Sequence, residues 1–428
     1  MNKMTKNKKY AKELLEFLDA APTPFQSTDE LSKMLEKAGA VKLCEGDEWK
    51  LEKDVLYYMT KEGTQLSAFR ISGEPKDDGF RIGAAHQDAP GFRIKTVPSK
   101  IDMGYERVCV ESYGGLILHG WADRPLSVAG RIYVKDENGN AIAKNVNIHK
   151  PILIMPSAAI HMVRGDEQGK FNVQTEFLPL FSQNSSGEVR FTEYLAKEIG
   201  CKKEDILSFE LAPYEYFPGC FVGENEEFIS VPRLDDAAMA HAIVSGIIEG
   251  KGGCDIAMIY DHEEIGSNSD RGARSAVLKM LIDRICASLG YTAEDKYRAL
   301  AKTVVFSADM AHATHPSFAQ KSDPNLPVKL NGGPVLKLAT RQSYATSSRG
   351  TAIFKLLCEK AKVPYQIFNN RSDVGGGGTI GPMLSADLGT VTVDIGNPML
   401  SMHSVREFAG TEDGYNMVRL YAAFFEGK

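Results

Sequence analysis

The stretch Tyr260-Asp261-His262-Glu263-Glu264-Ile265-Gly266-Ser267 is the most informative in this chain. It follows an apolar run, Ile256-Ala257-Met258-Ile259, which is typical of a buried strand. Two adjacent carboxylates raise each other's pKa unless a cation offsets their charge. Neighbouring side chains in extended backbone point in opposite directions, so one glutamate can bind a metal while the other handles a proton. A solvated acidic turn would show the same pattern, so this stretch alone does not distinguish a metal site from such a turn.

The composition is that of an ordinary globular protein. A length of 428 residues predicts two or three domains, and an apolar fraction of 43% is enough for a sizeable core. The net charge of −6 provides no basic surface for nucleic acid. The seven cysteines are scattered, odd in number and form no C-x-x-C pair, which favours a reducing compartment and argues against a cysteine-based zinc site.

Neither a signal peptide nor a transmembrane helix is expected. The Lys-rich N-terminus leads into an amphipathic helix pattern rather than an unbroken apolar segment. No window approaches the run of about 18 apolar residues that a membrane span needs. We therefore predict a cytoplasmic protein that does not bind a membrane.

Strand and helix patterns alternate at both ends of the chain. In the N-terminal part, helices are expected at residues 10–20 and from a capping box at Ser27-x-x-Glu30, and strands at 55–59, 66–71 and 80–85. The alternation returns after residue 231, with helices expected at 237–248, 272–289 and 347–361 and strands at 303–307, 365–368 and 390–395. This alternation predicts a three-layer α/β/α domain.

Residues 98–231 have a different character. They are rich in β-branched residues and glycine, and Asn138-Gly139 is a hairpin signal. We therefore predict a discontinuous catalytic domain, residues 1–97 and 232–428, interrupted by a largely β domain at residues 98–231. Within the insertion, His161 has apolar neighbours, a setting more typical of a buried core histidine than of a catalytic one.

Residue types that bind metals recur where apolar strands are expected to end. They are His86, Glu263, Glu264, Asp309 and His403. Asp235 precedes a helix that would start at the same edge. Open α/β sheets bind ligands beyond the carboxyl ends of their strands, so these side chains should meet.

This ligand set contains imidazoles and carboxylates but no cysteine, which suits zinc, manganese or cobalt. One catalytic zinc takes three protein ligands, whereas five ligands fit two zinc ions if one carboxylate bridges them. The remaining glutamate of the adjacent pair is then the general base. Asp88 lies two residues after His86 on the same face of an extended strand, where it can orient the imidazole.

These motifs together resemble the aspartyl aminopeptidase family of dizinc metallopeptidases. The matching pieces are Ala21-Pro22-Thr23-Pro24-Phe25, His86-x-Asp88 with Pro90-Gly91, Pro232-Arg233-Leu234-Asp235, Asp261-His262-Glu263-Glu264-Ile265-Gly266-Ser267, Asp309-Met310-Ala311-His312-Ala313, Gly333-Pro334-Val335-x-Lys337 and Met402-His403-Ser404-x-Arg406-Glu407. They occur in family order across nearly the whole chain, and the ordered set is far more specific than any single motif.

The resemblance implies two Zn²⁺ ions per subunit, with Co²⁺ or Mn²⁺ as alternatives. Asp235 would bridge the two metals. The remaining ligands would be His86 and Asp309 on one metal, and Glu264 and His403 on the other.

The resemblance also implies roles in catalysis and substrate binding. Glu263 would activate the water, and Asp88 would support His86. Lys337 matches a lysine associated with acidic substrate side chains, which implies a preference for peptides that begin with Asp or Glu. One departure is Asp236, because the family often has Asn at this position.

The insertion resembles the dimerisation domain of the same family. Its segment Ile160-His161-Met162-x-Arg164 matches one whose histidine reaches the active site of a neighbouring subunit. His161 is therefore a candidate for binding substrate and stabilising an oxyanion in trans. The family forms tetrahedral dodecamers, which implies a homo-oligomer of dimers assembled into a dodecamer.

The predicted function is that of a metallo-aminopeptidase acting on peptides with a free N-terminus. A related dizinc deacylase or carboxypeptidase is the first alternative, and a carboxypeptidase would need a cation for the terminal carboxylate. The second alternative is a non-catalytic assembly protein with the same fold. Loss of metal-binding residues would favour it, but every matched metal position is intact.

Overall fold

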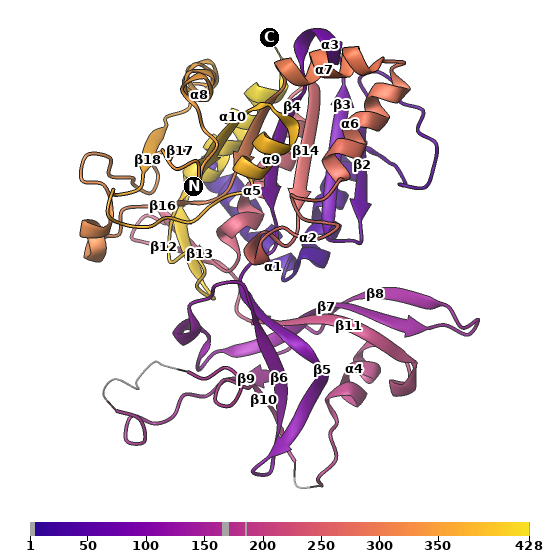
Figure 1. Cartoon of the computed structure of the whole chain (residues 1–428). Helices are drawn as coiled ribbons and strands as arrows, with labels where there is room; N and C mark the ends of the chain where they lie inside the picture. The colour runs from indigo at the N-terminus through magenta and orange to yellow at the C-terminus, as the bar shows by residue number, and fades with distance from the viewer. Residues whose placement is uncertain (1–4, 165–170, 185, 428) are drawn as a thin grey trace.

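The computed structural model describes residues 5–164, 171–184 and 186–427. A nine-stranded sheet forms the centre of the larger part of the molecule (Figure 1). Its strands, in spatial order, are β1 (Val41–Lys42), β2 (Leu56–Lys61), β3 (Gln65–Ile71), β14 (Cys254–Tyr260), β4 (Arg81–His86), β15 (Val304–Ala308), β19 (Val391–Gly396), β17 (Val335–Leu338) and β18 (Gln366–Asn369). The central strands β14, β4, β15 and β19 are parallel, so their carboxyl ends meet at one edge.

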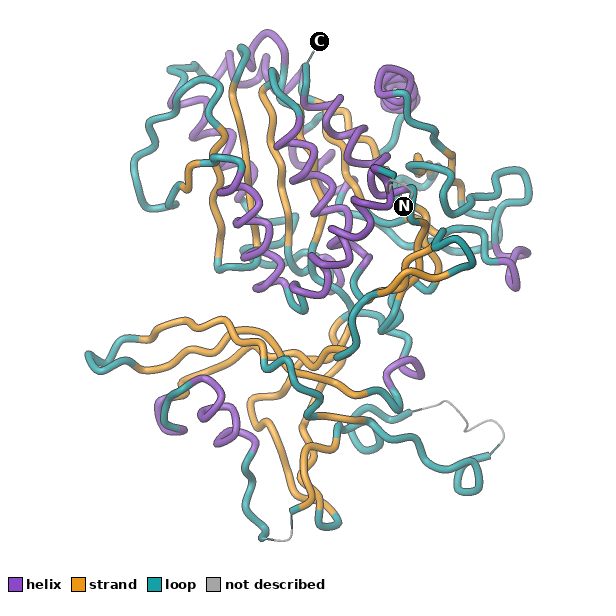
Figure 2. Tube along the Cα trace, turned by 180° about the vertical axis from the view of Figure 1, so that it is seen from behind, coloured by secondary structure: helices purple, strands orange, loops and turns teal. Residues whose placement is uncertain are grey.

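Helices cover both faces of this sheet because its central strands are apolar on both sides. In β14, Ala257 and Ile259 belong to one core cluster, whereas Ile256 and Met258 belong to the cluster on the opposite face. The first face carries α1 (Lys6–Ala20), α2 (Pro24–Lys37), α5 (Leu234–Glu249), α8 (Ser348–Ala361) and α10 (Asp413–Phe425). The second carries α6 (Val277–Ser288), α7 (Ala293–Lys302) and α9 (Gly381–Leu388). The predicted three-layer α/β/α architecture is confirmed (Figures 1 and 2).

A seven-stranded sheet forms the second part of the molecule, beyond the carboxyl edge of the first (Figure 1). Its neighbouring strands are antiparallel, and α4 (Phe191–Ile199) packs on it through Phe191 and Leu195. The strands are β5 (Gly91–Asp102), β6 (Tyr105–Tyr113), β7 (Pro125–Lys135), β8 (Ala141–Asn147), β9 (Leu153–Ile154), β10 (Leu180–Gln183) and β11 (Ile206–Glu215). This is the β-rich character expected of the insertion.

A small third sheet joins the end of the insertion to the C-terminal region. Its strands, in order, are β12 (Cys220–Val222), β13 (Phe228–Val231), β21 (Glu407–Gly410), β20 (Pro398–Leu400) and β16 (Ala311–His312). The expected entry into the insertion at residue 98 falls inside β5, and the expected exit falls directly after β13. The domain boundaries themselves stay a prediction.

Several predicted helix starts are wrong, α1 among them, which begins at Lys6 rather than at residue 10. Helix α2 begins at Pro24 rather than after the capping box, because the fixed φ of Pro24 suits the first helical position. Ser27 therefore lies inside the helix, where it is buried. Helix α6 begins at Val277 rather than near residue 272. Gly272 instead packs against the backbone of Ser267, so closely that a Cβ on residue 272 would lie only 2.3 Å from that carbonyl oxygen. No helix in the described residues is long and apolar enough to cross a membrane.

Candidate active site

A cavity of about 380 Å³ lies at the carboxyl ends of the central strands. His86 is the last residue of β4, the adjacent glutamates follow β14, and Asp309 follows β15. All the predicted metal ligands line this cavity: His86, Asp235, Glu264, Asp309 and His403. Glu263 and Lys337 line it too, so the residues that the sequence singled out meet at one place.

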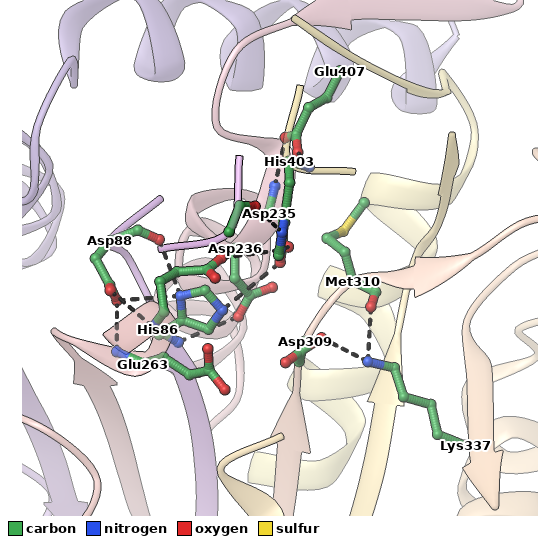
Figure 3. Close-up of polar contacts among 12 residues, drawn as sticks. His86, Asp88, Asp235, Asp236, Glu263, Asp309, Met310, Lys337, His403 and Glu407 are labelled. Carbon is green, nitrogen blue, oxygen red and sulfur yellow. Dashed lines mark hydrogen bonds and ion pairs between the residues drawn. The ribbon is translucent and has the colours of Figure 1, made fainter. Parts of the chain in front are cut away.

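Asp235 lies between two imidazole rings (Figure 3). Its Oδ1 is 3.7 Å from Nε2 of His86, and its Oδ2 is 3.3 Å from Nε2 of His403. The other ring nitrogen of each histidine contacts a backbone carbonyl: Nδ1 of His86 is 3.0 Å from the oxygen of Asp88, and Nδ1 of His403 is 2.7 Å from that of Gly115. A carbonyl partner fixes the proton on Nδ1 and leaves the Nε2 lone pair free for a metal.

The carboxylates around these rings fit a divalent cation. One close group contains His86, Glu263 and Glu264, and a second contains Asp235, Glu264 and His403, with the ligand atoms of each group within 4.8 Å of one another. Oδ1 of Asp235 and Oε1 of Glu264 are buried and accept no hydrogen bond from the described residues. Buried carboxylate oxygens without such partners are costly, and metal coordination satisfies them.

The pKa values show the same crowding of charge. Burial raises the pKa of Glu263 to about 7; the attraction of His86 lowers this pKa, and repulsion from Asp309 and Glu264 raises it. Burial lowers the pKa of His403, but the carboxylates of Asp235 and Glu264, each 3.3 Å from its Nε2, outweigh this and raise the pKa to about 11. A bound cation reverses such shifts because it stabilises carboxylates in their charged form and imidazole in its neutral form.

Asp88 contacts more of the site than its sequence position suggested. Its carboxylate accepts hydrogen bonds from the backbone N–H groups of Glu263 and Glu264, each at 3.1 Å. It also accepts one from the hydroxyl of Tyr113 at 2.8 Å, and it lies 3.3 Å from Nδ1 of His86. Asp88 therefore ties the histidine to the turn that carries both glutamates, a 3₁₀ turn that the sequence patterns did not predict.

Glu407 is a site residue to which sequence reasoning assigned no role. It is buried, and its two oxygens accept hydrogen bonds from the backbone N–H groups of Asp235 at 3.0 Å and His403 at 2.8 Å (Figure 3). One carboxylate thus joins two predicted ligands that are 168 positions apart in the sequence. Its place four residues after His403, inside a matched motif, was the available signal.

Lys337 is buried rather than exposed at the surface. Its ammonium group donates hydrogen bonds to Oδ1 of Asp309 and to the carbonyl of Met310, both at 2.7 Å (Figure 3). Burial lowers the pKa of Lys337, but Asp309 outweighs this and raises it to about 12. Asp309 is thus turned toward Lys337, and neither close ligand group in the described part of the chain includes it.

Asp236 is fully buried, and its Oδ2 accepts a hydrogen bond from the backbone N–H of His86 at 3.2 Å. Burial raises the pKa of Asp236 well above the ordinary range; the attraction of His86 lowers it, and repulsion from Asp309 and Asp235 raises it. Without a bound cation this environment favours the neutral carboxyl, which offers both a hydrogen-bond donor and an acceptor, as the Asn amide does.

His161 is exposed, which excludes the interpretation of a buried core histidine. It lies in a turn of the insertion and is not among the described residues that line the cavity of its own chain. Its expected role in a neighbouring subunit stays a prediction.

Comparison with known proteins places this chain in a family. The model of the family described as aminopeptidase I zinc metalloprotease (M18) matches residues 17–425. A probable M18 family aminopeptidase 2 from Clostridium novyi is 42% identical over 430 residues, covering 98% of this chain and 99% of the relative. A protein of the same name from Pseudomonas aeruginosa is 38% identical over 421 residues, covering 96% and 97%.

Solved structures agree with this assignment. A cryo-EM structure of the Ape4 and Nbr1 complex contains a chain that is 35% identical with a TM-score of 0.95, and the match covers 100% of this chain and 87% of that one. The S. cerevisiae mApe1 dodecamer is 25% identical with a TM-score of 0.87, covering 99% and 97%. The chain belongs to the M18 family of zinc metalloproteases, the aspartyl aminopeptidase family, and is a metalloaminopeptidase.

Proposed function

We propose that this aminopeptidase uses two zinc ions per subunit, with Co²⁺ or Mn²⁺ as substitutes, bridged by the carboxylate of Asp235. The observation that carries this proposal is that each oxygen of Asp235 faces a different imidazole. His86 would complete one metal position, and Glu264 and His403 the other. Asp309 is proposed as the remaining ligand, which requires it to share its carboxylate between a metal and Lys337.

Glu263 is proposed as the general base. Bound zinc would polarise the scissile carbonyl and make water a better nucleophile at neutral pH. The carboxylate of Glu263 takes a proton from the attacking water as the bond from oxygen to the carbonyl carbon forms. It then returns a proton to the nitrogen of the leaving peptide as the C–N bond breaks. Asp88 holds the backbone of Glu263 and so positions this carboxylate.

Lys337 is proposed to favour an acidic residue at the peptide N-terminus. It is a buried cation that lines the same cavity as Glu263. An incoming Asp or Glu side chain would compete with Asp309 for this ammonium group and release Asp309 for metal binding. A charged pair of this kind is strong where solvent is excluded.

The first experiment is hydrolysis of aminoacyl chromogenic substrates by zinc-reconstituted protein, with a panel of Asp, Glu, Leu, Met and Lys together with N-acetylated controls. Release from free-amine substrates only, lost with a chelator and restored by zinc, is the expected result, with two zinc ions per chain by elemental analysis. Full activity with one zinc would contradict the two-metal proposal. Equal rates for Asp, Glu and Leu would rule out Lys337 as the source of an acidic preference.

Assembly into dimers, and of dimers into a dodecamer, is proposed from the relative whose structure is a dodecamer. The insertion, residues 98–231, is the proposed dimerisation domain, because it forms a sheet of its own beyond the catalytic edge. It carries the exposed His161, which would enter the active site of a neighbouring subunit.

Replacing His161 by Ala is expected to lower kcat by about 10²-fold or more, as for loss of one oxyanion donor, with zinc content and oligomer size unchanged. Mixed assemblies of His161→Ala and Glu263→Gln chains test the action in trans, because each chain supplies what the other lacks. Recovery of activity on mixing, measured against each variant alone, is the expected result. No recovery in verified mixed oligomers would show that His161 does not act across subunits.

A further inference from the structure

A second cavity continues the catalytic one. Its volume is about 330 Å³, and it shares Gly378, Thr379 and Met383 with the cavity that contains the candidate metal ligands. On its other sides it is lined by residues with exposed side chains, including Arg274 and Gln342. The two cavities therefore adjoin, and the second is the more open to solvent.

The shared wall is held in place by Asp394, a fully buried residue of β19. Its carboxylate accepts hydrogen bonds from the hydroxyl of Thr379 at 2.7 Å and from the backbone N–H of Ala345 at 2.6 Å. Its own N–H donates to the hydroxyl of Thr346 at 2.8 Å. One strand thus anchors the loops on both sides of the passage, so the second cavity is built into the fold.

Arg274 supplies the uncompensated charge of this second cavity. Asp387 is the other charged residue that lines it, and its carboxylate is 3.5 Å from the ammonium group of Lys279. The guanidinium of Arg274 makes no hydrogen bond or ion pair with any side chain or carbonyl in the described parts of the chain. An exposed guanidinium with five donors is suited to bind a carboxylate.

We propose that the second cavity binds the peptide residue that follows the scissile bond, and that Arg274 selects a carboxylate there. An aminopeptidase holds one residue on the N-terminal side of the cleaved bond, and the rest of the peptide must leave toward solvent. The buried Lys337 closes one side of the catalytic cavity, whereas the passage at Gly378 and Thr379 opens outward. The carboxylate is an acidic side chain at the second residue or, in a dipeptide, the C-terminus. This inference rests on the proposed function.

The test separates binding from turnover by using zinc-loaded protein with Glu263→Gln. Calorimetry compares Leu-Asp-Gly, Leu-Gln-Gly and Leu-Lys-Gly, all amidated at the C-terminus, so that only the second residue varies. The Asp peptide is expected to bind about two- to fivefold more tightly than the Gln peptide, as for a solvent-exposed ion pair. Arg274→Gln should abolish that ratio, and Arg274→Glu should favour Lys instead. Leu-Gly with a free C-terminus is compared with Leu-Gly amide to test recognition of the C-terminal carboxylate. The free acid should bind more tightly, and Arg274→Gln should abolish the difference.

Arg349→Gln is the matched control, because Arg349 is exposed on α8 and lines neither cavity. Arg349→Gln removes the same charge and should leave unchanged the ratio of the affinities for the Asp peptide and the Gln peptide. A ratio unaffected by Arg274→Gln, or lowered equally by Arg349→Gln, would overturn the inference. Failure of the unmodified protein to hydrolyse any peptide would instead overturn the proposed function, because these binding ratios require no turnover.

Discussion

Replacing Glu263 by Gln is expected to lower kcat by about 10²–10⁴-fold while the zinc content per chain stays unchanged. Gln has nearly the same size but cannot accept the proton from water. The hydrogen bond from the backbone N–H of residue 263 to Asp88 does not involve the side chain, so the turn should keep its shape. Steady-state kinetics and elemental analysis of the same preparations measure both quantities.

The neighbouring variant Glu264→Gln is the matched control, because it makes the same chemical change one residue later. Glu264 belongs to both close ligand groups, so this variant should lose zinc together with activity. The contrast decides between two roles for Glu263, which also lies within 4.8 Å of the potential ligand atoms of His86 and Glu264. Loss of zinc in Glu263→Gln would make Glu263 a ligand rather than the base.

Replacing Glu407 by Ala is expected to weaken zinc binding by about 10–100-fold, as for other residues that orient metal ligands. It should also lower the free energy of unfolding of the zinc-free protein by about 2–6 kcal/mol. The physical reason is that the backbone N–H groups of Asp235 and His403 lose their acceptor, at about 1–3 kcal/mol for each buried group. Competition with a chromophoric chelator measures zinc affinity, and urea denaturation measures stability.

Two further variants test whether the loss of zinc affinity and stability comes from the missing hydrogen-bond acceptor at residue 407. Glu407→Gln keeps one acceptor oxygen, so its zinc affinity and its free energy of unfolding should both fall less than those of Glu407→Ala. Glu359→Ala removes an exposed carboxylate on α8 and should change neither. Zinc affinity in Glu407→Ala equal to that of the unmodified protein would show that Glu407 does not position the ligands.

Much of the fold was predictable because its signals are local. The apolar run of β14 is buried on both faces, and such runs occur where helices cover both sides of a sheet. The five-stranded sheet was missed because its strands are only two to four residues long and β13 pairs with β21 across nearly the whole C-terminal half of the chain. Short strands of this kind carry no periodicity that a sequence pattern can detect.

The candidate site, like the fold, was predictable only in part. The sequence by itself indicated that His86, the two adjacent glutamates and Asp309 follow central strands, and parallel strands bring their carboxyl ends to one edge. His403 instead follows β20, a strand of the sheet that was missed. Only the tertiary structure decided what orients these side chains. The carbonyl of Gly115 accepts from His403 across 288 positions, and Glu407 accepts from the N–H of Asp235 across 172. Every residue has a backbone carbonyl and nearly every residue has an N–H. A sequence pattern therefore cannot identify which of these groups will bond to a metal ligand, and only the folded structure shows the partners.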